Sequence, residues 1–110
     1  MVEEIELPIA KGLSEDFSLY WAAFANSAVS YWERSTHLPR NGMAFEPFTL
    51  GLAEYFEAHM GEFEGAIHRL QGVEGEMNRF HENFDVVLSP VVTTPPPEIG
   101  YLDGGLDFET

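Results

Sequence analysis

An apolar run at 86–88, followed by prolines, constrains the fold of this chain more than any other stretch. The run reads Val-Val-Leu and lies between Asp85 and Pro90. A continuous apolar run with such boundaries is typical of a strand that is covered on both faces. The triplet Pro95–Pro97 then favours an extended path with few backbone donors. We therefore expect a buried strand near 86–92, for which this chain holds too few neighbouring strands.

Helical periodicity accounts for much of the remaining chain. Apolar and aromatic side chains recur at helical spacing from Ser14 to about Ser35, and Ser14 is a favourable N-cap residue. Pro47 is suited to the first turn of a second, short helix, which we expect Gly61 to end. A third helix is predicted from about Glu62 to Asn83, with one apolar face.

The opening segment predicts a second short strand. In VEEIEL, at 2–7, Ile5 and Leu7 alternate with glutamates, and the run stops at Pro8. These patterns predict a mostly helical fold with three helices, an N-terminal strand and the strand near 86–92. We expect residues 1–110 to form a single, incomplete domain. Residues 101–110 lack periodicity and predict a flexible tail.

The composition restricts the classes of partner. The chain has 110 residues, of which 45% are hydrophobic, and 19 acidic residues against 5 basic ones give a net charge of -14. Such an acidic chain is a poor partner for nucleic acid or for an anionic membrane surface. It contains no cysteine, and no apolar run approaches the roughly 20 residues of a membrane helix. We therefore expect a soluble cytoplasmic protein.

The residues that carry chemistry form no recognisable constellation. The four histidines make no His-Glu-x-x-His pattern, and no serine lies in a Gly-x-Ser-x-Gly elbow. Lys11 is the only lysine, and there is no glycine-rich phosphate loop. We therefore predict no catalytic, metal-ligating or cofactor-binding residue. Ser89 stands apart because it follows a predicted strand, where open sheets place ligands.

Three segments resemble the amidase signature family. FDVVLSPVVTTPPPEIGYL, at 84–102, is similar to a segment in which an aromatic residue, Asp, an apolar run, Ser or Thr and Pro precede several prolines. EPFTLGLAEYFEA, at 46–58, resembles the short helix that follows a Glu-Pro pair in the family. VEEIELP, at 2–8, resembles a strand that precedes a long variable helix. Their order and spacing agree across nearly the whole chain.

The resemblance implies a segment of an α/β-sheet hydrolase that cleaves amide C–N bonds. The family uses a serine nucleophile, a bridging serine and a lysine base in a glycine- and serine-rich region, which has no counterpart in this sequence. The chain is therefore expected to be inactive alone, with its helices covering the sheet and shaping the substrate entrance. By resemblance, Ser89, Pro90 and Thr93 lie close to the substrate.

Two kinds of partner follow from these interpretations. The first is the remainder of an amidase, and the second is another copy of the chain. The alternative function is an independent helical module that binds a partner or forms a homodimer through an exposed aromatic face. A small-ligand pocket between the helices is a third possibility, supported by Trp21, Phe24 and Tyr31.

Overall fold

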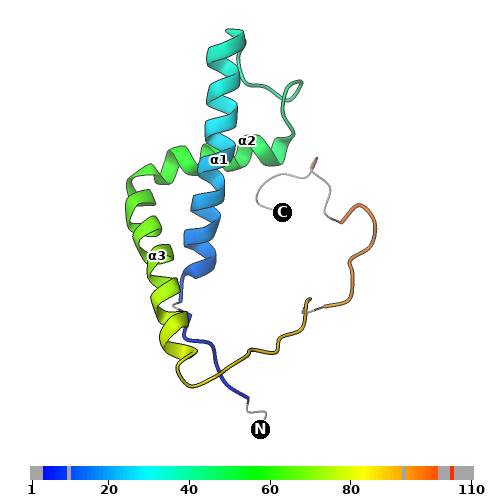
Figure 1. Ribbon diagram of the computed structural model, residues 1–110. Coiled ribbons are helices and arrows are strands. Elements are labelled where there is room, and N and C mark those ends of the chain that lie inside the picture. Colours follow the sequence, from blue (N-terminus) through cyan, green and yellow to red (C-terminus); the bar gives the residue numbers. More distant parts are fainter. Residues whose placement is uncertain (1–3, 10, 93, 102–104, 106–110) are drawn as a thin grey trace.

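The computed structural model describes residues 4–9, 11–92, 94–101 and 105 (Figure 1). It contains three α-helices, α1 (Leu13–Thr36), α2 (Pro47–His59) and α3 (Phe63–Phe80), and a 3-10 turn, η1 (Met60–Glu62), between the last two. α1 packs against both α2 and α3. In Figure 1, α2 crosses α1 and α3 runs beside the N-terminal half of α1.

The first helix has the predicted extent, but it begins differently. Its N-cap is Gly12, with a left-handed φ of 98°, and no side chain caps the helix. Leu13 is already helical, so Ser14 lies inside the first turn, where its hydroxyl donates to the Glu15 carboxylate at 2.9 Å. The predicted Ser14 cap is therefore wrong. A cap must occupy the first non-helical position, and glycine takes the left-handed conformation there without a steric cost.

The second and third helices confirm the periodicity. Pro47 opens α2 as expected, and Gly61 lies in η1, where the α-helical pattern is interrupted. α3 ends at Phe80 rather than at Asn83, because residues 81–83 form turns. In these turns the Asn83 N–H donates to the Phe80 carbonyl at 3.1 Å.

The core lies where the three helices meet, and it is small. In the described part of the chain, its buried apolar residues are Leu19, Ala22, Val29, Leu52, Ala53 and Ala66. Each helix contributes one alanine that is 0% exposed, and such small side chains allow helices to pack closely. The radius of gyration is 18.2 Å, whereas a compact domain of this length has about 13 Å.

The predicted strands and the α/β sheet are wrong. Residues 4–9 and 84–92 adopt no β-structure, and no strand occurs anywhere in the described residues. Val86 is 76% exposed, Leu88 82% and Val91 100%. A strand needs the unpaired N–H and C=O groups of a neighbouring strand, but the backbone groups inside the helices already bond to one another. An apolar run indicates that a segment favours burial, but it does not provide the neighbouring strand with which that segment would pair.

Two bidentate ion pairs join segments that lie far apart in the sequence. Arg69 on α3 donates to both Asp16 oxygens on α1, at 2.8 and 2.6 Å. Arg40, in the loop after α1, donates to both Glu57 oxygens on α2, at 2.7 and 3.0 Å. Asn26 of α1 also donates to Glu57, at 3.0 Å. These contacts fix how α1 lies against both of the other helices.

The Asp16–Arg69 pair predicts a pH-dependent contribution to stability. The hydrogen bonds from Arg69 hold the pKa of the Asp16 carboxyl below its ordinary value of 3.8. Because the folded-state pKa is depressed, the pair stabilises the folded state above about pH 4 and is lost as the pH falls through the folded pKa. Asp16→Asn should therefore lower the free energy of unfolding at pH 7, and this loss should shrink at pH 3.

Denaturant titrations at the two pH values measure this difference. Glu74→Gln, which removes an exposed carboxylate from the middle of α3, is the matched control and should leave the free energy of unfolding nearly unchanged. Equal effects of Asp16→Asn at both pH values would contradict the prediction.

Candidate functional site

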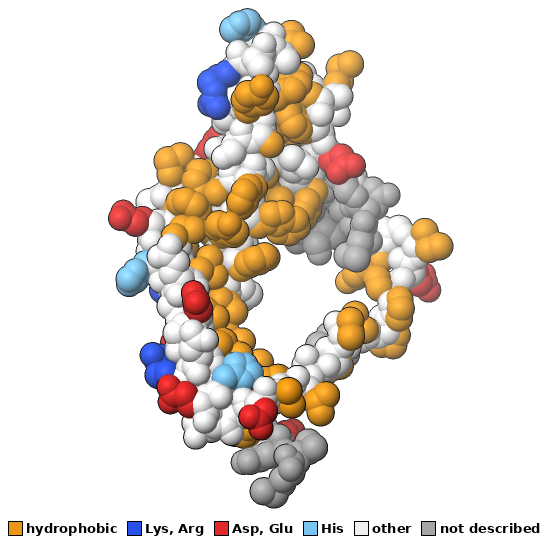
Figure 2. All heavy atoms as spheres, viewed as in Figure 1, with side chains coloured by type: hydrophobic (Ala, Val, Ile, Leu, Met, Phe, Trp, Pro, Cys, Tyr) orange, Lys and Arg blue, Asp and Glu red, His pale blue; other side chains and the backbone are white. Residues whose placement is uncertain are grey.

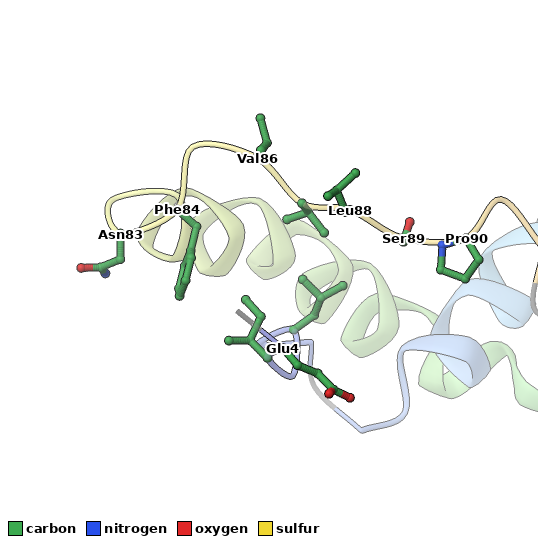
Figure 3. Close-up of a pocket in the computed structure, with 10 residues that line it drawn as sticks. Glu4, Asn83, Phe84, Val86, Leu88, Ser89 and Pro90 are labelled. Carbon is green, nitrogen blue, oxygen red and sulfur yellow. The ribbon is translucent and has the colours of Figure 1, made fainter. Parts of the chain in front are cut away.

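An apolar groove lies between the N-terminal segment and the segment that leaves α3 (Figure 3). It has a volume of about 510 Å³. One side is formed by Glu4, Ile5 and Leu7, and the other by 83–84 and 86–90. The two sides are about 80 positions apart in the sequence, so the fold of the helices brings them together.

The end of α3 sets the position of Phe84 at the start of this groove. The Phe84 ring stacks on Phe80 with a centroid distance of 4.7 Å. His81 Nδ1 lies 2.8 Å from the Phe84 carbonyl oxygen, so the tautomer with a hydrogen on Nδ1 donates to it. Figure 3 shows the Phe84 side chain on the side of the exiting segment that faces Glu4. The chain therefore leaves the helix in a defined direction.

Two of the three predicted substrate-proximal residues lie on the groove. Ser89 and Pro90 line it, and Thr93 lies outside the described residues. Ser89 is exposed, and its hydroxyl makes no hydrogen bond to any described residue. Their proximity to a substrate stays a prediction, because the groove carries no ligand-specific feature at either residue.

The chemistry of the groove suits an apolar contact better than amide cleavage. A serine nucleophile needs a neighbouring base, and neither His nor Lys lines the groove beside Ser89. The tetrahedral intermediate of amide hydrolysis carries negative charge and needs hydrogen-bond donors. The ionisable side chain on the lining is Glu4, which supplies an acceptor of the wrong charge. The groove can cover apolar groups.

The exiting segment is apolar on its other side as well. In Figure 3, Val86 and Leu88 point away from the N-terminal segment. Farther along, Val91, Val92 and Ile99 are exposed. Figure 2 shows hydrophobic side chains along this arm of the molecule and over the crossing of α1 and α2. The segment therefore offers apolar surface on two sides.

Among the described residues, no three His, Asp or Glu side chains are grouped so that they could hold a metal ion. Within the described part of the chain, no helix combines the length and the apolar character needed to cross a membrane.

The residues proposed for a small-ligand pocket lie on the surface of α1. Phe24 and Tyr31 are exposed, and Trp21 is half exposed, with its ring centroid 5.8 Å from that of Phe48. The groove lies elsewhere, between the chain segments before α1 and after α3. A ligand pocket between the aromatic helices is therefore not supported by the placement of these side chains.

Sequence reasoning missed the N-terminal wall of the groove. The alternation of Ile5 and Leu7 was the available signal, and it indicated a strand. In the structure Ile5 is 36% and Leu7 40% exposed, and both line the groove across from the segment that leaves α3. The pairing of Asp16 with Arg69 was also missed, because no sequence periodicity relates positions 53 residues apart.

The chain is similar in sequence to curated mycobacterial proteins named "Putative amidase AmiC". The proteins from Mycobacterium tuberculosis (strain ATCC 25618 / H37Rv) and Mycobacterium bovis are each 31% identical over 110 residues, which is 99% of this chain and 23% of the relative. The Mycobacterium leprae protein is 30% identical over 97 residues, which is 88% of this chain and 21% of the relative. The chain thus spans about a quarter of the length of the curated relatives it matches. No protein-family model matches the chain, and no solved structure matches it.

Proposed function

We propose that this chain is a segment of an amide C–N hydrolase of the amidase signature type, and that it is inactive by itself. Its helices cover other parts of that enzyme and help to shape the substrate entrance. Ser89 and Pro90 lie on the side that faces the substrate. The observation that carries this proposal is the similarity to amidase-named relatives, which extends over 99% of the chain but over 23% of each relative.

The exposed apolar segment that leaves α3, called the exiting arm below, supports the proposal. Burying a single Val or Leu side chain is worth about 1.5–3 kcal/mol, and the arm leaves several of them in water, among them Leu88 and Val91. A longer protein can cover this arm with residues that this chain does not contain. The small core and the large radius of gyration agree with the same interpretation.

The groove also supports inactivity of the isolated chain. Ser89 has no neighbouring base, and no group on the groove lining carries a positive charge to face a developing oxyanion. In this proposal the nucleophile, the base and the oxyanion donors come from the rest of the enzyme. This chain contributes helices that cover other parts of the enzyme and help to shape the substrate entrance.

A chimera tests the proposal. The chain replaces the matching 110 residues of the Mycobacterium tuberculosis relative, and ammonia release from simple primary amides is measured for the chimera, the parent protein and the isolated chain. We expect hydrolysis by the parent and the chimera and none by the isolated chain. A parent with the matching region deleted is the control and should be inactive.

Two results would contradict the proposal in different ways. Serine-dependent turnover by the isolated chain would show that it holds its own active site. A folded chimera that leaves every substrate of the parent intact would show that this chain cannot replace the matching segment of an amide hydrolase.

A further inference from the structure

The loop that joins α1 to α2 holds an exposed Asn-Gly pair in an ordered turn (Figure 1). Asn41 and Gly42 are both exposed. The Asn41 carbonyl accepts the N–H groups of Ala44 and Phe45, each at 3.1 Å. The pair therefore has a defined conformation although it lies in water.

The backbone nitrogen of Gly42 is available as a nucleophile. Its N–H makes no hydrogen bond within the described part of the chain. A Cβ built on Gly42 would meet nothing within 4 Å, so no neighbouring atom covers the residue on that side. Glycine also has no side chain that would crowd the approach of its own nitrogen to another carbonyl carbon. Water or hydroxide can therefore reach this N–H and remove its proton.

The side-chain amide of Asn41 is held beside that nitrogen. The Met43 N–H donates to Asn41 Oδ1 at 3.0 Å, which is the contact of an Asx-turn. The ring closed by this hydrogen bond contains the Gly42 nitrogen. When that nitrogen adds to the amide carbon, negative charge develops on Oδ1, and a backbone N–H aimed at this oxygen stabilises the charge. One contact thus both positions and activates the amide.

We propose that Asn41–Gly42 is a self-modification site, at which Asn41 is converted to aspartate and isoaspartate through a cyclic imide. The Gly42 nitrogen loses its proton to water and forms a bond to Asn41 Cγ. The bond from Cγ to Nδ2 breaks, and Nδ2 takes up a proton and leaves as ammonia. Water then opens the imide. Its addition at Cγ gives aspartate, and its addition at the main-chain carbonyl carbon gives isoaspartate.

The other asparagines of the chain lack this arrangement. Asn26 and Asn78 lie inside α1 and α3, where the N–H of the following residue bonds to the carbonyl four residues back. Asn83 precedes Phe84, whose ring stacks on Phe80 and leaves no glycine-like freedom at the attacking nitrogen. We therefore expect modification to concentrate at Asn41. The inference stands on this turn and does not depend on an amidase role.

The modification changes the connection between α1 and α2. Either product adds one negative charge to the turn. In isoaspartate the main chain runs through the former side chain and gains one carbon atom, and the carbonyl that Ala44 and Phe45 contact becomes part of a carboxylate outside the main chain. The turn should therefore loosen, together with the edge-to-face contact of Phe45 on Trp32, whose ring centroids lie 5.4 Å apart.

Peptide mass spectrometry after incubation of the purified chain in mildly alkaline buffer tests the proposal. Cleavage after glutamate releases residues 34–46, which contain Asn41 and no other asparagine. We expect this peptide to gain the mass difference between NH₂ and OH, as isoaspartate and aspartate forms, before any peptide with another asparagine does. Gly42→Ala should slow the reaction at least about tenfold, or about 1.4 kcal/mol in the barrier, because the added methyl group crowds the attacking nitrogen.

The alanine variant is a fair comparison because it fits the turn. Gly42 has no positive φ, and its Cβ position is open; far-UV circular dichroism verifies that the helices are kept. The same incubation in denaturant shows what the folded turn contributes. We expect the folded chain to react at least as fast as the unfolded one, because the Met43 N–H stays aimed at Oδ1.

Three results would overturn the proposal. Slower reaction in the folded chain than in the unfolded one would show that the turn protects Asn41. Aspartate as the sole product would show direct hydrolysis of the amide, which forms no imide. Equal rates for Gly42→Ala and the original chain would show that the Gly42 nitrogen does not attack.

Discussion

Shortening Leu52 to alanine should destabilise the isolated chain by about 2–4 kcal/mol, a large part of the 5–15 kcal/mol of an ordinary domain. Leu52 on α2 is 4% exposed and, with Leu19 and Val29, is one of the few large side chains in the described core. Its loss leaves a cavity that the helices can fill only by shifting. The free energy of unfolding from a denaturant titration measures the effect.

A matched truncation on the exiting arm is the control. Val91→Ala also removes apolar carbon atoms, but Val91 is 100% exposed, and substitutions at such positions usually change stability by less than about 0.5 kcal/mol. Comparable losses for Leu52→Ala and Val91→Ala would show that the arm is buried in solution, contrary to the structure.

Leu88→Asp should be harmless in the isolated chain and severe in the longer enzyme. In the isolated chain Leu88 is 82% exposed, so a carboxylate there stays in water and stability should change by less than about 0.5 kcal/mol. In the chimera proposed above, the same carboxylate is covered by the rest of the enzyme without a cation. Burying an uncompensated charge costs several kcal/mol, so folded protein and amide hydrolysis should both be lost.

Thermal unfolding of both proteins, together with the hydrolysis assay on the chimera, measures the contrast. Leu88→Met is the control, because it keeps an apolar side chain of similar volume and should be tolerated in both. If the chimera tolerates Leu88→Asp as well as the isolated chain does, the exiting arm is not covered in the enzyme. The proposed reason for its apolar character would then be lost.

The helices could be predicted from the sequence because their signals are local. Aromatic and apolar residues at helical spacing specify α1 almost to the residue. Pro47 is the first residue of α2, and Gly61 lies in η1, where the α-helical pattern is interrupted. The cap of α1 was less predictable. A serine and a glycine lie two positions apart, and both are acceptable caps, so the choice depends on how the preceding segment approaches the helix.

The strands could not be predicted because pairing is not local. The run at 86–88 favours burial, and its residues are consistent with a strand, but a strand forms only when a second segment supplies hydrogen-bond partners. No described segment of this chain does so. Alternation at Ile5 and Leu7 likewise predicted a strand, but no described segment pairs with residues 4–9, and the two side chains line the groove instead.

The candidate site was predictable in part. The sequence singled out Ser89 and Pro90, and the structure places both on the groove. Their role toward a substrate stays a prediction, and Thr93 lies outside the described residues. The contact between the segments before α1 and after α3 depends on helix packing, and so does the Asp16–Arg69 pair. Such long-range contacts leave no periodic trace in a single sequence.

The three buried alanines, Ala22, Ala53 and Ala66, have a consequence for how this sequence can change during evolution. Each is completely enclosed, so a larger residue at any of them must push two helices apart. The large aromatic residues on the outside of α1 face no such restriction within one chain. Natural sequence variation should therefore be narrowest at these three buried alanines and wider at the exposed aromatic residues of α1.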